Sequence, residues 1–178
     1  MDDFYRQHES WNTFTRALGE FHVAYSWAEK AVTSLLVFLM EGDPNRSLIV
    51  LYRMDSRAKC ERVRKLAKAF RPEDSTEIAA MADGHEALSA YRNTVAHSCF
   101  EWHLTKYRFS LSSFGEEAFP STPKAVQPKQ VRELTAKATE ADKLADKIWA
   151  YLAERDAVSG LDPSRPSRIV EIKASHKG

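Results

Sequence analysis

Apolar residues recur along the first forty positions at the spacing of a helix. Between Trp11 and Met40 they fall every three or four residues, which places them on one face of a helix. Gly42, Asp43 and Pro44 then end the pattern, because glycine and proline stop helices. The same spacing predicts a second helix from about Ser47 to Phe70. It closes at Arg71-Pro72, since the residue before a proline avoids the helical conformation.

Two further helices are predicted at residues 74–98 and 128–155, and the period changes between them. Phe100, Trp102 and Leu104 alternate with polar residues, and so do Phe109 and Leu111. Alternation with a period of two is typical of a half-buried strand, so a β-hairpin is expected at about residues 99–113. The stretch 115–128 contains three prolines and is predicted to be a loop.

Each of the four predicted helices has one apolar face, and these faces must be buried against one another. The pattern therefore predicts an all-α fold, a four-helix up-down bundle with a β-hairpin inserted between the third and fourth helices. Residues 1–156 are expected to form this helical domain. Residues 157–178 contain Gly160, Pro163 and Pro166 and are expected to form a flexible C-terminal tail.

The net charge of +1 over 178 residues conceals a segregation of charge along the chain. Residues 46–71 hold nine basic and two acidic side chains, and the segments on both sides are acidic. On the predicted second helix, Arg53, Arg57, Arg64 and Lys68 share one stripe opposite the apolar face. A basic stripe of this kind is typical of an RNA-binding surface. The alternative is a solvated helix face whose cations pair with acidic neighbours.

Several classes of protein are not expected from this sequence. Its two cysteines cannot form a disulfide framework and favour a reducing compartment, so a cytoplasmic protein is expected. The N-terminus is acidic and lacks the basic start of a secretory signal. The most apolar run, Leu35–Met40, is too short to span a membrane. No metal-ligand spacing and no glycine-rich phosphate loop occur, so neither a metal nor a cofactor is expected.

Arg92 and His97 are the candidate catalytic residues. Arg92 falls near the middle of the apolar face of the third predicted helix, where burying an unpaired charge is costly. His97 follows five residues later, at the end of that helix. An imidazole can move the proton of an RNA 2′-hydroxyl, and a guanidinium can hold the scissile phosphate. Asn93 can hydrogen-bond to either group or to a phosphate oxygen.

The string Arg92-Asn93-x-x-Ala96-His97 resembles the catalytic motif of the HEPN superfamily, in its RNxxAH form. The long first helix with Trp27-Ala28-Glu29, the position of the motif and the hairpin before the last helix are also similar, over about residues 10–155. The resemblance implies a homodimer with a metal-independent endoribonuclease site at its cleft, usually leaving a 2′,3′-cyclic phosphate. Arg92 and His97 would be its catalytic pair. Many members are toxins with an antitoxin partner, or phage-defence effectors. One subgroup carries a tyrosine two residues after the histidine, and this tyrosine is modified. In this sequence that position is Cys99.

Structural interpretations of the same residues stay open at this point. Arg92 can pair with a buried acid, for which Glu29 at the edge of the first apolar stripe is the candidate. His97 can be stabilised by the C-terminal dipole of its helix. His85 shares a face with Arg92 and is either a core histidine or a residue supporting the site. The competing function is a non-catalytic module that binds RNA, a nucleotide or a protein. A third is an antitoxin or regulator that binds a partner through its tail.

Overall fold

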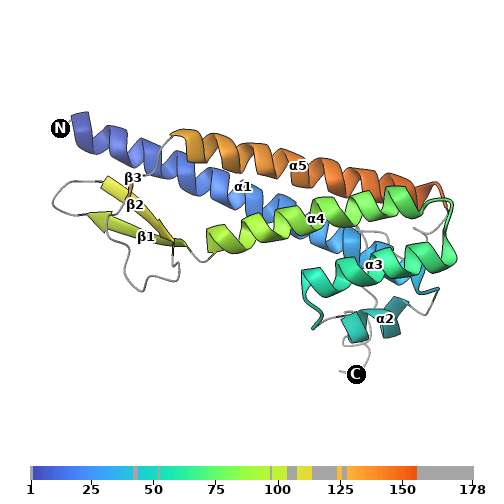
Figure 1. The fold of residues 1–178 in the computed structure, drawn as a ribbon. Coiled ribbons are helices and arrows are strands. Elements are labelled where there is room, and N and C mark those ends of the chain that lie inside the picture. The colour runs from blue at the N-terminus through green and yellow to red at the C-terminus, as the bar shows by residue number, and fades with distance from the viewer. Residues whose placement is uncertain are drawn as a thin grey trace, which may run out of the picture. The chain divides into compact units, whose positions relative to one another are not determined.

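A computed structural model describes residues 2–41, 44–51, 53–96, 98–103, 108–113, 124–125 and 128–155. Side chains are described within residues 12–41, 46–49, 51, 53–96 and 129–155. Figure 1 shows five helices and three strands in this part of the chain. In chain order these are α1 (Asp2–Leu39), α2 (Pro44–Leu51), α3 (Ser56–Phe70), α4 (Ser75–Ala96), β1 (Ser98–His103), β2 (Arg108–Ser113), β3 (Lys124–Ala125) and α5 (Pro128–Ala153).

The predicted second helix is two helices. Asp55 has an extended backbone, with φ −69° and ψ 161°, and its carboxylate accepts a hydrogen bond from the backbone N–H of Ala58 at 2.7 Å. This is an N-cap, which satisfies a free N–H group at the start of α3. Arg53 lies in the turn before Asp55, outside α3. The predicted stripe that aligned Arg53 with Arg57, Arg64 and Lys68 on one helix is therefore wrong in this respect.

The predicted fold class also requires correction, both in its number of helices and in its number of strands. Its helical character is confirmed, but the described residues contain five helices rather than four. The predicted two-stranded hairpin is replaced by a three-stranded antiparallel sheet in the order β1-β2-β3. Its third strand comes from the stretch predicted to be a loop, with Ser110 opposite Ala125 and Leu111 opposite Lys124. A pairing of two residues leaves no alternating pattern long enough to recognise in a sequence.

The chain divides into two compact units. Unit 1 comprises Met1–Ala28 and Gly84–Leu144, and unit 2 comprises Glu29–Asp83 and Ala145–Gly178. Helices α1, α4 and α5 each contribute residues to both units. These units divide the span that the sequence predicts as one helical domain. The predicted tail, residues 157–178, lies outside the described residues.

The core of unit 1 is formed by the N-terminal part of α1, the C-terminal part of α4 and α5. Its buried apolar side chains are Phe14, Ala17, Phe21, Ala24, Ala28, Leu88, Leu134, Ala138 and Ala141. Phe21 meets Tyr91 edge to face, with 5.3 Å between ring centroids, and Tyr25 stacks on His85 at 5.5 Å. As numbers rise along α1 the contacted residues fall along α4. The two helices are therefore antiparallel in this unit, and these aromatic contacts set their register.

Unit 2 buries a second apolar cluster. Its fully buried members are Val32, Leu35, Leu36, Cys60, Val63, Ala67, Ile78, Met81, Ile148 and Leu152. A polar group ties the start of α4 to the end of α5: the Tyr151 hydroxyl and the Arg155 Nη2 donate to Asp74 Oδ2 at 2.9 and 2.8 Å. These bonds lower the pKa of Asp74, with the bond from Tyr151 the larger cause. Burial, followed by the bond to Asp74, raises the pKa of Tyr151 to about 12.

Gly19 lies within α1, and a Cβ atom added there would meet no atom within 4 Å. Glycine inside a helix loses more backbone entropy on folding than alanine does. Gly19→Ala is therefore expected to stabilise the protein by about 0.5–1 kcal/mol. Urea unfolding followed by circular dichroism measures this change. An unchanged or lower free energy of unfolding would show that Gly19 does not limit the stability of α1.

Candidate ribonuclease site

Arg92 lies in the last part of α4, within unit 1, and is partly exposed. Its Nη1 donates a hydrogen bond to Oδ1 of Asn93 at 3.1 Å, and Asn93 itself is exposed. Among the residues whose side chains are described, no carboxylate forms an ion pair with Arg92. A guanidinium has five N–H donors, so this single bond leaves donors for an anionic ligand. Arg92 and Asn93 are thus together, as the motif predicts. His97 lies outside the described residues.

The acid predicted as a structural partner of Arg92 is held elsewhere. Glu29, in unit 2, forms an ion pair through Oε1 with the ammonium group of Lys59, and its Oε2 accepts from Ser56 Oγ at 2.8 Å. Lys59 also donates to Thr33 Oγ1 at 3.1 Å. Both carboxylate oxygens of Glu29 are therefore used in joining α1 to α3. The predicted support of Arg92 by Glu29 is replaced by this cluster of Glu29, Lys59, Ser56 and Thr33.

A lysine on the apolar face of α3 was the sequence signal for this cluster. Lys59 directly precedes the buried Cys60 and lies four residues before the buried Val63, and only 10% of its side chain is exposed. A buried lysine needs a carboxylate partner, because an unpaired charge is costly away from water.

His85 is a core histidine. It is fully buried on α4, and its ring stacks on Tyr25 with an angle of 25° between the ring planes. Of the two predicted roles, burial favours the structural one, because no face of this ring is open to a substrate.

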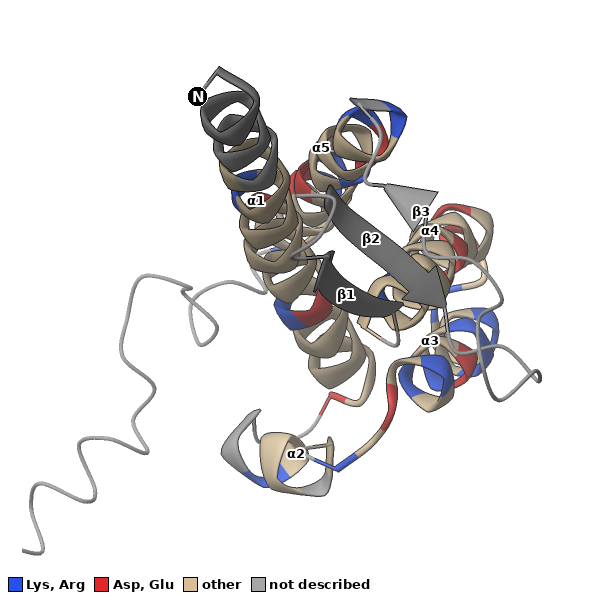
Figure 2. Cartoon of the chain, turned by 90° about the vertical axis from the view of Figure 1, so that its left-hand side faces the viewer, with Lys and Arg blue, Asp and Glu red and all other residues tan. Residues whose placement is uncertain are grey.

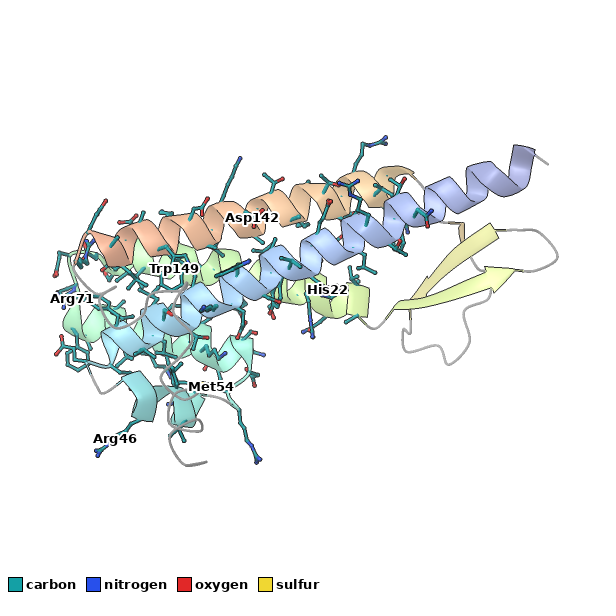
Figure 3. All side chains as sticks on the ribbon, turned by 180° about the vertical axis from the view of Figure 1, so that it is seen from behind. His22, Arg46, Met54, Arg71, Asp142 and Trp149 are labelled. Carbon is teal, nitrogen blue, oxygen red and sulfur yellow. The ribbon has the colours of Figure 1, made fainter. Side chains whose placement is uncertain are left out.

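His22 is the residue that the sequence analysis missed. It lies on α1 in unit 1, is partly exposed, and is labelled in Figure 3. Burial lowers the pKa of His22, and the positive charge of Arg92 lowers it further. An imidazole whose charged form is disfavoured stays neutral near pH 7. The only signal in the sequence is the position of His22 directly after the apolar residue Phe21, which is too common a pattern to single it out.

Lys and Arg residues recur along α3 (Figure 2, blue). Their side chains differ in their pairing and exposure. Arg64 donates from Nε and Nη2 to Oδ1 of Asp83 at 2.8 and 2.6 Å. Arg57 and Glu61 are exposed and lie 3.7 Å apart, one helical turn from each other. Lys68 is exposed, and so is Arg53 in the preceding turn. The alternative interpretation, pairing with acids, therefore holds for Arg64 and, as an exposed pair, for Arg57.

Two exposed cations on α3 were not among the predicted RNA-binding residues. Arg62 and Lys65 both face solvent. They lie beside the predicted stripe rather than on it, which is why the stripe omitted them.

Two further observations on the described residues concern metal ions and membranes. In the part of the chain that the structure describes, no three His, Cys, Asp or Glu side chains lie together as ligands for a metal ion. None of the described helices combines the length and apolar character that crossing a membrane requires.

No protein-family model, curated protein or solved structure matches this chain. Its function is therefore argued from its own residues.

Proposed function

We propose that this protein is a metal-independent endoribonuclease in which Arg92 and His97 act on the scissile phosphodiester. The observation that carries the proposal is the state of Arg92. Its guanidinium is partly exposed, is hydrogen-bonded to Asn93, and has no ion-paired carboxylate among the described side chains. An arginine with a purely structural role in a helical core is paired with an acid. The resemblance of the Arg92–His97 motif to the HEPN superfamily supports the same function.

The chemistry assigns one task to each residue. Arg92 binds the phosphate through two N–H groups and stabilises the negative charge of the pentacoordinate transition state. Asn93 holds the guanidinium in position by accepting its hydrogen bond. His97 exchanges protons with the reacting oxygens. The products are a 2′,3′-cyclic phosphate and a free 5′-hydroxyl. The resemblance also implies a homodimer and an antitoxin partner. The small number of cysteines, two in the chain, supports a reducing, cytoplasmic location.

The test is an RNA cleavage assay with purified protein in excess EDTA. Wild type is expected to cleave single-stranded RNA and to leave 2′,3′-cyclic ends, which resist phosphatase until acid opens the ring. Intact RNA at every pH tested, with structured, single-stranded and tRNA substrates, would contradict the proposal. RNA binding without cleavage would favour the second candidate, a non-catalytic RNA-binding module. The specific observation behind that candidate is the exposed cationic face of α3.

That face consists of Arg57, Arg62, Lys65 and Lys68, and its contribution to RNA binding can be measured separately. Each cation that contacts a phosphate of single-stranded RNA releases a counterion, so the slope of log K against log salt changes by about 0.7 per contact. The double variant Lys65→Ala/Lys68→Ala is expected to weaken binding and to flatten this slope by about 1.4. Fluorescence anisotropy at several salt concentrations measures both quantities.

Arg64→Ala is the matched control, because it removes a cation from the same helix that Asp83 already neutralises. Its affinity and slope are expected to stay close to those of wild type. Equal losses in the control and in the double variant would show that the net charge of the protein, rather than the exposed face of α3, attracts the RNA.

A further inference from the structure

His22 and Arg92 each directly follow one member of the aromatic contact that packs α1 on α4 in unit 1. The Phe21 ring contacts Tyr91, one residue before Arg92, and Tyr25 contacts His85, two turns earlier on α4. His22 directly follows Phe21, and their ring centroids are 5.7 Å apart. These aromatic contacts hold both helices in register. They fix His22 near enough to Arg92 for the arginine charge to act on its imidazole.

His22 is partly exposed, so a ligand in solution can reach this residue. Ser26 Oγ donates to the backbone carbonyl of His22 at 2.8 Å, so this contact involves the main chain and not the ring. Arg92 of α4 is the charged group that acts on His22, and Glu133 of α5 acts on Tyr91, the residue before Arg92. On α1 itself, Arg16 and Glu20 form an exposed ion pair. Burial lowers the pKa of His22 and the charge of Arg92 lowers it further, so both favour the neutral ring, which is the form that accepts a proton.

We infer that His22 is a second catalytic histidine, the general base that takes the 2′-hydroxyl proton of an RNA whose phosphate is bound by Arg92. This inference rests on the proposed ribonuclease function. In the step, the 2′-oxygen loses its proton to the His22 imidazole and forms a bond to phosphorus, while the bond from phosphorus to the 5′-oxygen breaks. The leaving 5′-oxygen takes a proton from the imidazolium of His97. One proton is accepted and one is donated, so the step balances.

A general base and a general acid with opposite tasks predict a bell-shaped pH–rate profile. The low-pH side rises as the base loses its proton. His22→Gln cannot accept a proton but keeps a polar side chain of similar length. It is expected to cleave RNA about 100-fold or more slowly at pH 7, and to lose the rising low-pH limb. Circular dichroism and thermal unfolding show whether the variant is folded, and His22→Asn provides a second substitution.

An NMR titration of wild type tests the contact without relying on a His22 variant. Histidine ring signals of the full-length protein report the pKa of His22 directly. Arg92→Gln is expected to raise that pKa, because it removes the positive charge that opposes protonation. Arg16→Gln, which removes a cation from the exposed ion pair on the same helix, is expected to leave it unchanged. No change in Arg92→Gln would overturn the inferred juxtaposition.

The outcomes separate this inference from the proposal beneath it. An active wild type with a slow His22→Gln variant and a lost low-pH limb supports the assignment of His22 as the base. An active wild type whose His22→Gln variant keeps its rate, or keeps the limb while slowing, overturns the assignment and leaves the ribonuclease proposal standing. An inactive wild type overturns both.

Discussion

Purified Arg92→Gln and His97→Ala are each expected to cleave RNA at least about 1,000-fold more slowly than wild type. The loss for Arg92→Gln follows from removing a bidentate, charged phosphate ligand that stabilises the transition state. The loss for His97→Ala follows from removing one of the proton-transfer groups. Both variants are expected to stay folded. Arg92 is partly exposed and donates a hydrogen bond to its neighbour Asn93, and no ion pair of Arg92 is found among the described side chains.

The measurement is the initial rate of cleavage of a labelled RNA in EDTA, with unfolding curves recorded for every variant. Arg16→Gln is the charge-matched control, since it also removes one arginine from a helix of unit 1 but breaks only an exposed ion pair with Glu20. Asn93→Ala is expected to lose less activity than Arg92→Gln, because it loosens the guanidinium without removing it. Wild-type rates in folded Arg92→Gln would refute a catalytic role for this arginine.

The largest expected effect on stability comes from Lys59→Met. Lys59 forms an ion pair with Glu29 and donates to Thr33, and the Lys59 and Glu29 side chains are only 10% and 26% exposed. Removing the ammonium group leaves a carboxylate that is largely withdrawn from water and has lost its ion-pair partner, while Ser56 still donates to it. The expected loss is about 2–4 kcal/mol, because breaking a buried pair costs more than the pair contributes.

Urea unfolding of a two-by-two set of variants measures this effect. Lys59→Met/Glu29→Gln is expected to recover part of the loss, since no unpaired charge remains. Arg57→Ala is the control on the same helix. It breaks an exposed pair with Glu61 and is expected to change stability by less than about 1 kcal/mol. A similar small loss for Lys59→Met would show that water reaches Glu29 and satisfies its carboxylate.

The helices show how much of the fold the periodic spacing of apolar residues can predict. The 3.6-residue spacing located α4 and α5 to within about two residues, which is the usual uncertainty of helix ends. It joined α2 and α3 because Leu48, Ile49, Tyr52 and Cys60 keep an approximate spacing across the break. Asp55 caps α3 through one local hydrogen bond, and such a bond leaves little trace in the hydrophobic pattern.

The residues of the candidate site also divide into those that the sequence revealed and those that it did not. Arg92, Asn93 and His97 were found because they are close along one helix, so that a local motif describes them. His22 is seventy residues away from Arg92 in sequence and was missed. Glu29 was assigned to Arg92 because both lie on apolar helix faces. A position on such a face predicts that a side chain is buried, but it does not predict which side chain it contacts. In the structure, Glu29 pairs with the ammonium group of Lys59, whose side chain is only 10% exposed.

By itself, the sequence determined the helical character of this protein and the sorting of its charges. These depend on spacing along the chain, which the covalent structure imposes. Only the tertiary structure decided that His22 lies near Arg92, that Glu29 belongs to Lys59, and that Asp83 neutralises Arg64 while its neighbours on α3 stay exposed. These pairings depend on which helices pack together and in what register, and large aromatic contacts such as Phe21 on Tyr91 set that register.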